Sequence, residues 1–345
     1  MGRRDDRVER EVGAYLAEEV GRQRVPGLSA AVLLRGQPLL IGGYGMADIE
    51  LSVPATPDTV YELASVTKPF TATAVALLSE DGELGLDDPV RTYFPESPPA
   101  WSEVTVRHLL AHTSGIPNYF ELDTFRPRGE FDWRLDYDQG EFLAAVAAAP
   151  LRFRPGERSG YSNSGYYLLG MLVERVAGEP YGRFLARRIF EPLGMGSTCL
   201  NDRAAIIPGR ADGYTLRDGA LGNAEYTSNT WAYAEGGIVS SASDMARWDA
   251  ALTEGRVLPP PLLRRMWEPA RLSDGRAGEF GLSWWAGEIG GRRVIAHNGS
   301  KPGFSSDHVR FVGEGLSVVL LANRDGVQLR RLVEAVAGLL PIGGS

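Results

Sequence analysis

Ser65 and Lys68 place a hydroxyl and an ammonium group three positions apart in the segment 64–70. Residues three apart share one face of a helix, and residues 66–80 have helical periodicity. A lysine at this distance can take up the proton of the serine if burial in a cleft lowers its pKa. The helix N-terminus would supply backbone N–H groups for an oxyanion. An N-capping serine followed by a solvated lysine is the alternative interpretation.

Tyr161 and Asn163 form a second pair, in the loop 158–165 that precedes a predicted helix. Two positions apart in an extended segment, their side chains point to the same side and can enter one cleft. A phenol beside an ammonium group can carry the proton of a nucleophile to a leaving group. A hydrogen-bonded loop tyrosine next to a helix cap would give the same pattern.

His297, Gly299 and Ser300 form a third group at the end of a predicted strand. Gly299 lets a substrate approach the strand backbone closely. The backbone N–H of Ser300 is then placed to donate a hydrogen bond to an oxyanion. A simple turn at the end of an edge strand is the alternative.

Strand-like segments lie near both ends of the chain, whereas the middle has helical periodicity. Strands are predicted over residues 28–35, 38–46, 280–287, 292–297, 306–313 and 316–322. Helices are predicted over residues 5–23, 66–80, 104–111, 139–149, 163–177, 181–190, 243–252 and 327–340. This order predicts an α/β fold of the α+β type, in which terminal helices flank an antiparallel sheet and a mostly helical lobe borders a cleft.

The same order predicts two domains. Residues 1–64 and 275–345 would form a discontinuous sheet domain, and residues 65–274 a mainly helical domain. Within the latter, residues 119–140 mix aromatic and acidic residues without a period, which predicts a long loop that either forms a lid or covers the helical lobe. We expect Tyr119 and Tyr233 to face the cleft and contact the substrate, although core packing is the commoner fate of an aromatic residue.

Composition excludes several classes of function. The 345 residues carry 36 Lys+Arg and 44 Asp+Glu without a basic cluster, so neither nucleic acid nor a membrane surface is an expected partner. A single cysteine, Cys199, cannot form an internal disulfide or a thiolate metal site. His108 and His112 are four apart, but the acidic residue of a zinc-protease motif is missing, so capping is expected. We predict no metal and no cofactor.

The N-terminal residues are charged and lack the apolar run of a secretory signal. No stretch of about eighteen apolar residues occurs, so no membrane-spanning helix is expected. These features favour a cytoplasmic enzyme. The oligomeric state is left open.

Together, Ser65-x-x-Lys68, Tyr161-x-Asn163 and His297-x-Gly299 resemble, in chain order, the motifs of the penicillin-recognising serine hydrolases. This is the superfamily of class C β-lactamases and DD-peptidases. Connecting segments are similar as well, so that the resemblance spans nearly the whole chain; they are residues 109–117, 153–156, 191–195 and 236–241. The resemblance implies a β-lactamase/transpeptidase-like fold.

The resemblance also implies roles for individual residues. Ser65 would be acylated, and Lys68 and Tyr161 would transfer protons in an order that the sequence does not decide. Asn163 would hold Lys68 and the substrate. The backbone N–H groups of Ser65 and Ser300 would form the oxyanion hole.

The third motif departs from the Lys-Thr-Gly usual in β-lactamases and carboxypeptidases of this superfamily. His297 is at best partly charged near neutral pH, so it is a weaker receptor for a substrate carboxylate, although Lys301 could replace the missing charge. His-x-Gly is known among esterases, D-amino-acid amidases and aminopeptidase-like relatives.

The expected function is therefore a carboxylesterase that forms an acyl-Ser65 intermediate on a small-molecule ester. A D-amino-acid peptidase or amidase, or a DD-carboxypeptidase, with weak activity on β-lactams is the alternative. A non-catalytic penicillin-binding-like protein is a third interpretation, disfavoured because each catalytic side chain is present.

Overall fold

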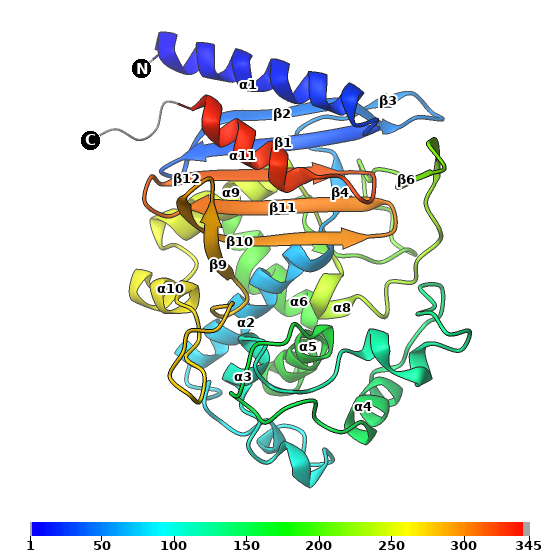
Figure 1. The fold of residues 1–345 in the computed structure, drawn as a ribbon, viewed down its shortest axis with the longest axis vertical. Helices are drawn as coiled ribbons and strands as arrows, with labels where there is room; N and C mark the ends of the chain where they lie inside the picture. Colours follow the sequence, from blue (N-terminus) through cyan, green and yellow to red (C-terminus); the bar gives the residue numbers. More distant parts are fainter. Residues whose placement is uncertain (1, 341–345) are drawn as a thin grey trace.

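Seven strands form one antiparallel sheet in the computed structural model, which describes residues 2–340 (Figure 1). Their order is β3-β2-β1-β12-β11-β10-β9, so β1 pairs with β12 from the other end of the chain. The predicted sheet built from distant segments is confirmed. The strands are β1 (Gly27–Leu34), β2 (Gln37–Asp48), β3 (Val53–Pro54), β9 (Trp285–Ile289), β10 (Arg292–Lys301), β11 (Phe304–Phe311) and β12 (Leu316–Ala322).

Alternate residues of the central strands enter two separate cores, because successive side chains of a strand point to opposite faces. In β1, Leu28, Ala30 and Val32 belong to the core on the outer face. Ala31 and Leu33 join the larger core between the sheet and the helical body. β12 alternates in the same way, which explains why both strands are continuous apolar runs in the sequence.

The first and last helices, α1 (Gly2–Arg22) and α11 (Leu329–Leu339), cover the outer face of the sheet (Figure 1). Apolar residues of both helices are buried in the outer core. The two terminal helices predicted to flank the sheet are thus observed. Among the described residues, no helix combines the length and apolar character needed to cross a membrane.

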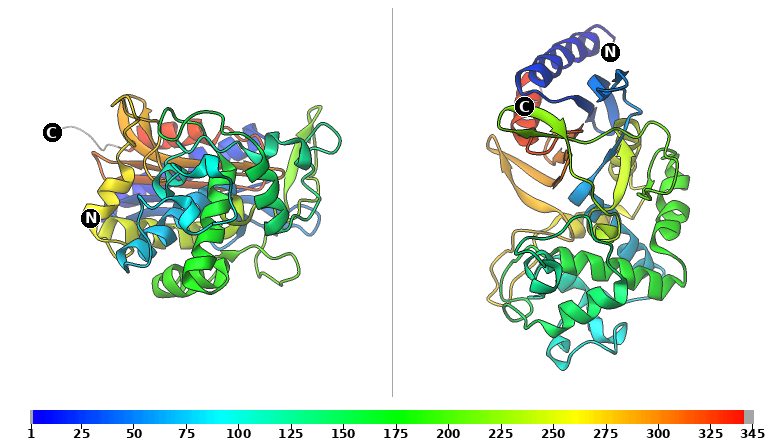
Figure 2. Two further views of the ribbon diagram at one scale, coloured as in Figure 1. Left: turned by 90° about the horizontal axis from the view of Figure 1, so that it is seen from below. Right: turned by 90° about the vertical axis from the view of Figure 1, so that its right-hand side faces the viewer.

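A mostly helical body covers the opposite face of the sheet (Figure 2). Within it, α9 (Ala242–Glu254) packs directly on β1, β2 and β12. The other helices are α2 (Lys68–Glu80), α3 (Val106–Leu110), α4 (Gln139–Ala148), α5 (Asn163–Ala177), α6 (Tyr181–Leu185), α7 (Glu191–Leu193), α8 (Tyr233–Gly236) and α10 (Pro260–Trp267). The division of the chain into two domains stays a prediction.

Several short elements differ from the sequence prediction. One small sheet consists of β4 (Val60–Glu62), β8 (Ile238–Ser241) and β5 (Cys199–Leu200), and a hairpin consists of β6 (Tyr214–Arg217) and β7 (Ala220–Asn223). Strands this short carry too few residues to show alternation. β9 begins later than predicted, because Ser283 has a φ of +83° and interrupts the extended backbone.

The predicted long loop follows α3 and leads into α4. Over residues 118–138 it contains 3₁₀ turns at Tyr119–Glu121 and Asp123–Phe125. Tyr119 and Phe125 are buried, with ring centroids 5.5 Å apart. The segment is therefore packed against the helical body, and a lid function stays a prediction.

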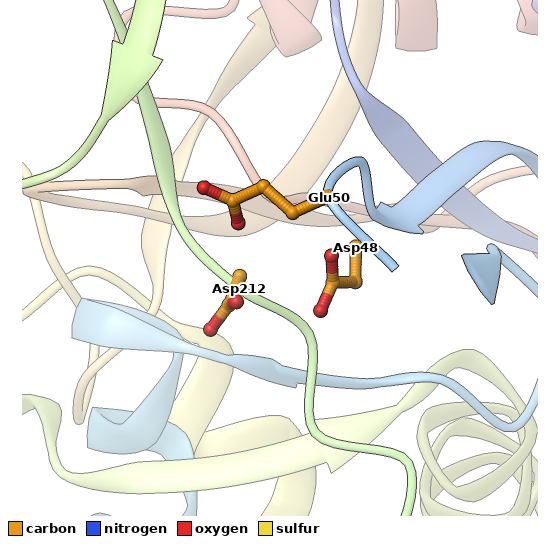
Figure 3. Close-up of side chains that lie close together, drawn as sticks. All are labelled: Asp48, Glu50 and Asp212. Atoms are coloured by element: carbon orange, nitrogen blue, oxygen red, sulfur yellow. The ribbon is translucent and has the colours of Figure 1, made fainter. Parts of the chain in front are cut away.

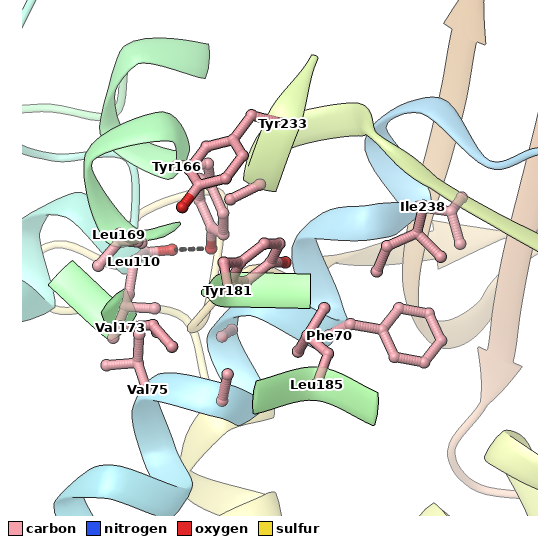
Figure 4. Packing of buried hydrophobic residues seen from close by; sticks show 14 of the residues in the cluster. Phe70, Val75, Leu110, Tyr166, Leu169, Val173, Tyr181, Leu185, Tyr233 and Ile238 are labelled. Carbon is pink, nitrogen blue, oxygen red and sulfur yellow. Dashed lines mark hydrogen bonds between the residues drawn. The ribbon is translucent and has the colours of Figure 1, made fainter. Parts of the chain in front are cut away.

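Helices α5 and α8 pack closely in the core of the helical body (Figure 4). Tyr233 of α8 contacts Tyr181, with ring centroids 5.1 Å apart. Gly170 of α5 makes this approach possible, because a Cβ there would lie 2.3 Å from the Ala234 Cβ and 2.5 Å from the Tyr233 ring. The position of α8 thus depends on the glycine at position 170, which has no side chain.

We expect Gly170→Ala to destabilise the protein by about 1–3 kcal/mol, since the added methyl group must displace α8. Gly338 in α11 is the matched control, because a Cβ there meets no atom within 4 Å. Gly338→Ala should be neutral or stabilising by up to about 1 kcal/mol. Thermal and urea denaturation measure both changes, and equal effects of the two substitutions would contradict the packing argument.

Candidate active site

Ser65 lies on a sharp turn between β4 and α2. Ala64 has a φ of +46°, which is unusual for a residue with a side chain, and a 3₁₀ turn over Ala64–Thr67 leads into the helix. Lys68 is the first residue of α2, and its Nζ lies 3.1 Å from the Ser65 Oγ. The three-residue spacing therefore brings hydroxyl and ammonium into contact, as the sequence predicted.

Glu235 of α8 is the counterion of Lys68. The Lys68 Nζ donates to the Glu235 carboxylate at 2.9 Å and to its backbone carbonyl at 2.7 Å. Both side chains are buried. Burial alone would lower the pKa of Lys68, but the charge of Glu235 and the contact with Tyr161 outweigh it, so that this pKa is raised. The lowered pKa of Lys68 predicted from the sequence is wrong, because the fold places the Glu235 carboxylate beside it.

Tyr119 holds the other oxygen of Glu235. Its hydroxyl shares its one hydrogen between the Trp231 carbonyl oxygen at 2.7 Å and Glu235 Oε1 at 3.1 Å. The carboxylate thus links the long loop to Lys68. The sequence does contain a signal for Glu235, because it is the one charged residue in the apolar run 231–239. A lone charge in such a run is expected to be buried with a partner.

Tyr161 lies beside the Ser65–Lys68 pair, in the loop before α5. Its ring centroid is 5.0 Å from the Lys68 Nζ, and its ring stacks on His112 at 4.4 Å. His112 accepts a hydrogen bond from the Ser162 backbone N–H through Nδ1. Tyr161 keeps 39% of its surface exposed, so its hydroxyl can reach a substrate.

Asn163 lines the cleft as the first residue of α5. Its Oδ1 is buried and has no hydrogen-bond partner among the described residues. The resemblance implied that Asn163 holds Lys68, but the Lys68 ammonium group donates to Ser65 and Glu235 instead. The Asn163 Oδ1 is therefore a buried acceptor without a partner in the described part of the chain, on a residue that lines the cavity.

Gly299 brings strand β10 against the turn that carries Ser65. A Cβ at Gly299 would lie 2.3 Å from the Leu63 carbonyl oxygen and 3.0 Å from the Ser65 nitrogen. Any side chain here would push the strand away. The glycine thus lets the backbone of β10 lie directly against the turn that carries Ser65. An oxyanion hole formed by the Ser65 and Ser300 N–H groups stays a prediction.

His297 is buried next to these groups on β10. Burial, with the positive charge of Lys68, lowers the pKa of His297 to about 3, so the ring is neutral at physiological pH. Its Nδ1 lies 2.8 Å from the Asn298 carbonyl oxygen, which can only accept, so Nδ1 carries the hydrogen. His297 therefore does not carry the partial positive charge that the sequence allowed near neutral pH.

Lys301 does not replace that charge. Its Nζ forms an ion pair with Glu62, and both side chains are largely buried. Its ammonium group also lies 5.2 Å from the centroid of the Trp231 ring. The positive charge is compensated, which leaves this end of the cleft nearly neutral.

These groups surround a cavity of about 860 Å³ between the sheet and the helical body. Most of the predicted site residues line it: Ser65, Tyr161, Asn163, His297, Gly299 and Ser300. Tyr119 and Tyr233 do not line it, contrary to expectation, because Tyr119 turns its hydroxyl to Glu235 and Tyr233 packs in the helical core. Phe120 and Trp231 line it instead.

The remaining candidates have structural positions. His108 caps α3 by accepting from the Thr105 backbone through Nδ1. Cys199 is half-buried on β5, and burial raises the pKa of its thiol. Neither residue contributes to the cavity that contains Ser65.

An acidic cluster lies elsewhere, at the end of β2 (Figure 3). Asp48, Glu50 and Asp212 each place a carboxylate oxygen within 4.8 Å of the others. Burial and the charges of Asp48 and Glu50 raise the pKa of Asp212. Glu50 also accepts a hydrogen bond from Asn223. Such exposed groups are common on protein surfaces without a bound ion.

Comparison with known families agrees with this geometry. A model of the Beta-lactamase family matches residues 7–339. The chain belongs to this family. The family is part of the β-lactamase and penicillin-binding-protein superfamily of serine hydrolases, so the predicted family and fold are confirmed.

Several members of the superfamily are similar to the chain. A penicillin-binding protein of Bacillus subtilis is 31% identical over 84% of this chain, and a D-aminopeptidase of Gluconobacter oxydans is 28% identical over 86%. The matches span 66% and 56% of those relatives' own length. A solved D-amino acid amidase from Ochrobactrum anthropi, complexed with L-phenylalanine amide, has a TM-score of 0.83 and 28% identity; the match covers 96% of this chain and 98% of that one.

Glu235→Gln is expected to lower kcat/KM at pH 7 by about tenfold or more, because Lys68 loses the charge that keeps it protonated. A lysine that is active as an ammonium group loses activity as the pH rises through its pKa. The alkaline limb of the pH profile should therefore move to lower pH. Glu279→Gln is the control, since Glu279 lines the cavity but is not among the groups that shift the pKa of Lys68. An unshifted limb in Glu235→Gln would contradict this role.

The lowered pKa of His297 predicts a ring that stays neutral from pH 5 to 8 and takes up a proton only near pH 3. ¹⁵N NMR of the imidazole nitrogens, assigned by loss of the signal in His297→Gln, should show Nδ1 protonated and Nε2 bare throughout this range. A titration midpoint for this ring between pH 5 and 8 would show that it carries charge under working conditions.

Proposed function

We propose that the protein hydrolyses amides of D-amino acids through an acyl-Ser65 intermediate. The observation that carries the proposal is the neutral His297 in the slot where carboxylate-binding relatives have lysine. A substrate with a free carboxylate beside the scissile bond would meet no unpaired cation there, since Lys301 is paired with Glu62 and Arg330, which also lines the cavity, is paired with Asp307. An amino-acid amide has no such carboxylate.

The similarities support the same substrate class. The D-amino acid amidase matches this chain over nearly the full length of both chains, and the D-aminopeptidase matches most of this chain. The first choice made from the sequence was an ester substrate, and the amide was the alternative. The similarities favour the alternative.

In the proposed acylation, the Ser65 Oγ attacks the substrate carbonyl carbon. The resulting oxyanion is stabilised by the backbone N–H groups of Ser65 and Ser300, which Gly299 allows to converge. The C–N bond then breaks, and the nitrogen leaves as an amine after it takes a proton from the Tyr161 hydroxyl. Water hydrolyses the acyl-enzyme by the reverse path.

Lys68 completes the proton balance. Because its pKa is raised, it starts as an ammonium group and cannot simply accept the Ser65 proton. We infer a shuttle in which Lys68 gives one proton to Tyr161 as Tyr161 protonates the amine, and takes one from Ser65. Its contacts with both groups suit this path. Lys68 ends the step charged, as it began, with Glu235 as its constant counterion.

A carboxylesterase is the second candidate, because the neutral His297 also suits esters without a second charge. An alkoxide or phenolate leaves more easily than an amine and depends less on protonation by Tyr161. Tyr161→Phe should therefore lower amide turnover far more than turnover of a p-nitrophenyl ester.

The test compares D-phenylalanine amide, a p-nitrophenyl ester and a chromogenic cephalosporin as substrates. We expect amide turnover that exceeds cephalosporin turnover and falls by about a thousandfold or more in Ser65→Ala. Ser102→Ala, an exposed serine away from the cavity, is the control. Ester turnover without amide turnover would favour the esterase. No turnover of any substrate, with no covalent adduct from a phosphonate, would falsify the enzyme assignment.

A further inference from the structure

Three aromatic side chains, Phe120, Trp133 and Trp231, form a contiguous wall on one side of the cavity. Ring centroids are 5.2 Å apart for Phe120 and Trp133, 4.7 Å for Trp133 and Trp231, and 5.8 Å for Phe120 and Trp231. We refer to these three residues as the aromatic wall. They come from the long loop and from the segment before α8, which are distant in sequence.

Hydrogen bonds within the protein hold the residues of the aromatic wall in place. The Ser228 backbone N–H donates to the Trp133 carbonyl at 2.8 Å, and the Tyr119 hydroxyl donates to the Trp231 carbonyl at 2.7 Å. The Tyr137 backbone N–H also donates to the Thr230 side chain. These bonds join the long loop to residues 228–231, so a ligand would meet a preformed surface.

Strand β10 gives the position of the wall relative to Ser65. In the middle of this strand, Ala296 pairs with Trp285 of β9. At the end of the strand, the Lys301 Nζ lies 5.2 Å from the centroid of the Trp231 ring. A strand rises about 3.3 Å per residue, so these positions are about 16 Å apart, with Gly299 and Ser300 between them. Trp285 and the aromatic wall therefore lie at opposite ends of the cavity.

Tyr161 lies toward the Trp285 end. Its ring centroid is 5.9 Å from that of Phe280, which forms a β-bridge with Trp285, and 6.2 Å from that of His297, the residue after Ala296 in β10. A leaving group must be within reach of the Tyr161 hydroxyl to be protonated. The leaving group therefore occupies the Trp285 end, and the acyl part of the substrate extends the other way, past Ser300 toward the aromatic wall.

We propose that the aromatic wall binds the side chain of the acyl group and selects aromatic or bulky apolar acyl groups over small ones. The inference rests on the proposed function, since it assigns a specificity to the same acyl-Ser65. Lys301 at this end is paired with Glu62, and Arg217, which lines an adjoining pocket with Trp133 and Lys301, is paired with Glu225. The wall itself therefore offers an apolar surface beside compensated charges. Aromatic surfaces bind aromatic side chains through burial and edge-to-face contacts.

The test is the ratio of kcat/KM for D-phenylalanine amide to that for D-alanine amide. We expect the wild type to prefer the phenylalanine substrate by about tenfold or more, and Trp133→Ala to remove most of this preference. Trp285→Ala is the matched control, a half-buried tryptophan that lines the other end of the same cavity. It should leave the ratio unchanged. Equal ratios in wild type and Trp133→Ala would overturn the assignment.

Two further measurements separate this inference from the proposed function. If amides are not hydrolysed, p-nitrophenyl phenylpropanoate and acetate provide the same comparison of acyl groups with an ester leaving group. Calorimetry of D-phenylalanine and D-alanine binding to Ser65→Ala measures the affinity of the aromatic wall for each side chain without any turnover. Tighter binding of phenylalanine that is lost in Ser65→Ala/Trp133→Ala supports the wall, and equal binding of both amino acids overturns it.

Discussion

The buried ion pair between Lys68 and Glu235 is the interaction on which the rest of the site depends. Removing two charges from water costs several kcal/mol per ion, and only close contacts offset that cost. The pair meets this condition. Lys68 donates to Ser65 and twice to Glu235, and Glu235 accepts from Tyr119 as well. Removing one partner would leave a buried charge, a loss of about 3–5 kcal/mol.

The pair also explains why distant parts of the chain meet. It joins the start of α2 to α8, and through Tyr119 it includes the long loop. Gly170 of α5 lets α8 come close enough for this contact. The same loop carries Phe120 and Trp133 into the cavity. Charge balance at Lys68 and the shape of the cavity therefore depend on one set of contacts.

The sequence predicted the parts of this structure that depend on local pattern. The helix over residues 163–177 has the observed bounds, and the contact between Ser65 and Lys68 follows from their spacing. The lone charge in an apolar run indicates that Glu235 is buried with a partner, but its partner is 167 positions away, and no local pattern identifies Lys68 as that partner. The expected role of Tyr119 failed for the same reason: its hydroxyl faces a carboxylate that only the tertiary fold supplies.

The two proposed oxyanion donors belong to different halves of the molecule. Ser65 lies at the start of the helical body, whereas Ser300 lies on a strand of the main sheet, with Gly299 as the contact between them. Their separation is therefore set by the packing of one half on the other, including α9 on β1 and β12. A small shift in that packing would part the two N–H groups while every helix and strand stayed intact. The catalytic rate should therefore fall when the packing between the sheet and the helical body loosens, well before any spectroscopic signal of unfolding changes.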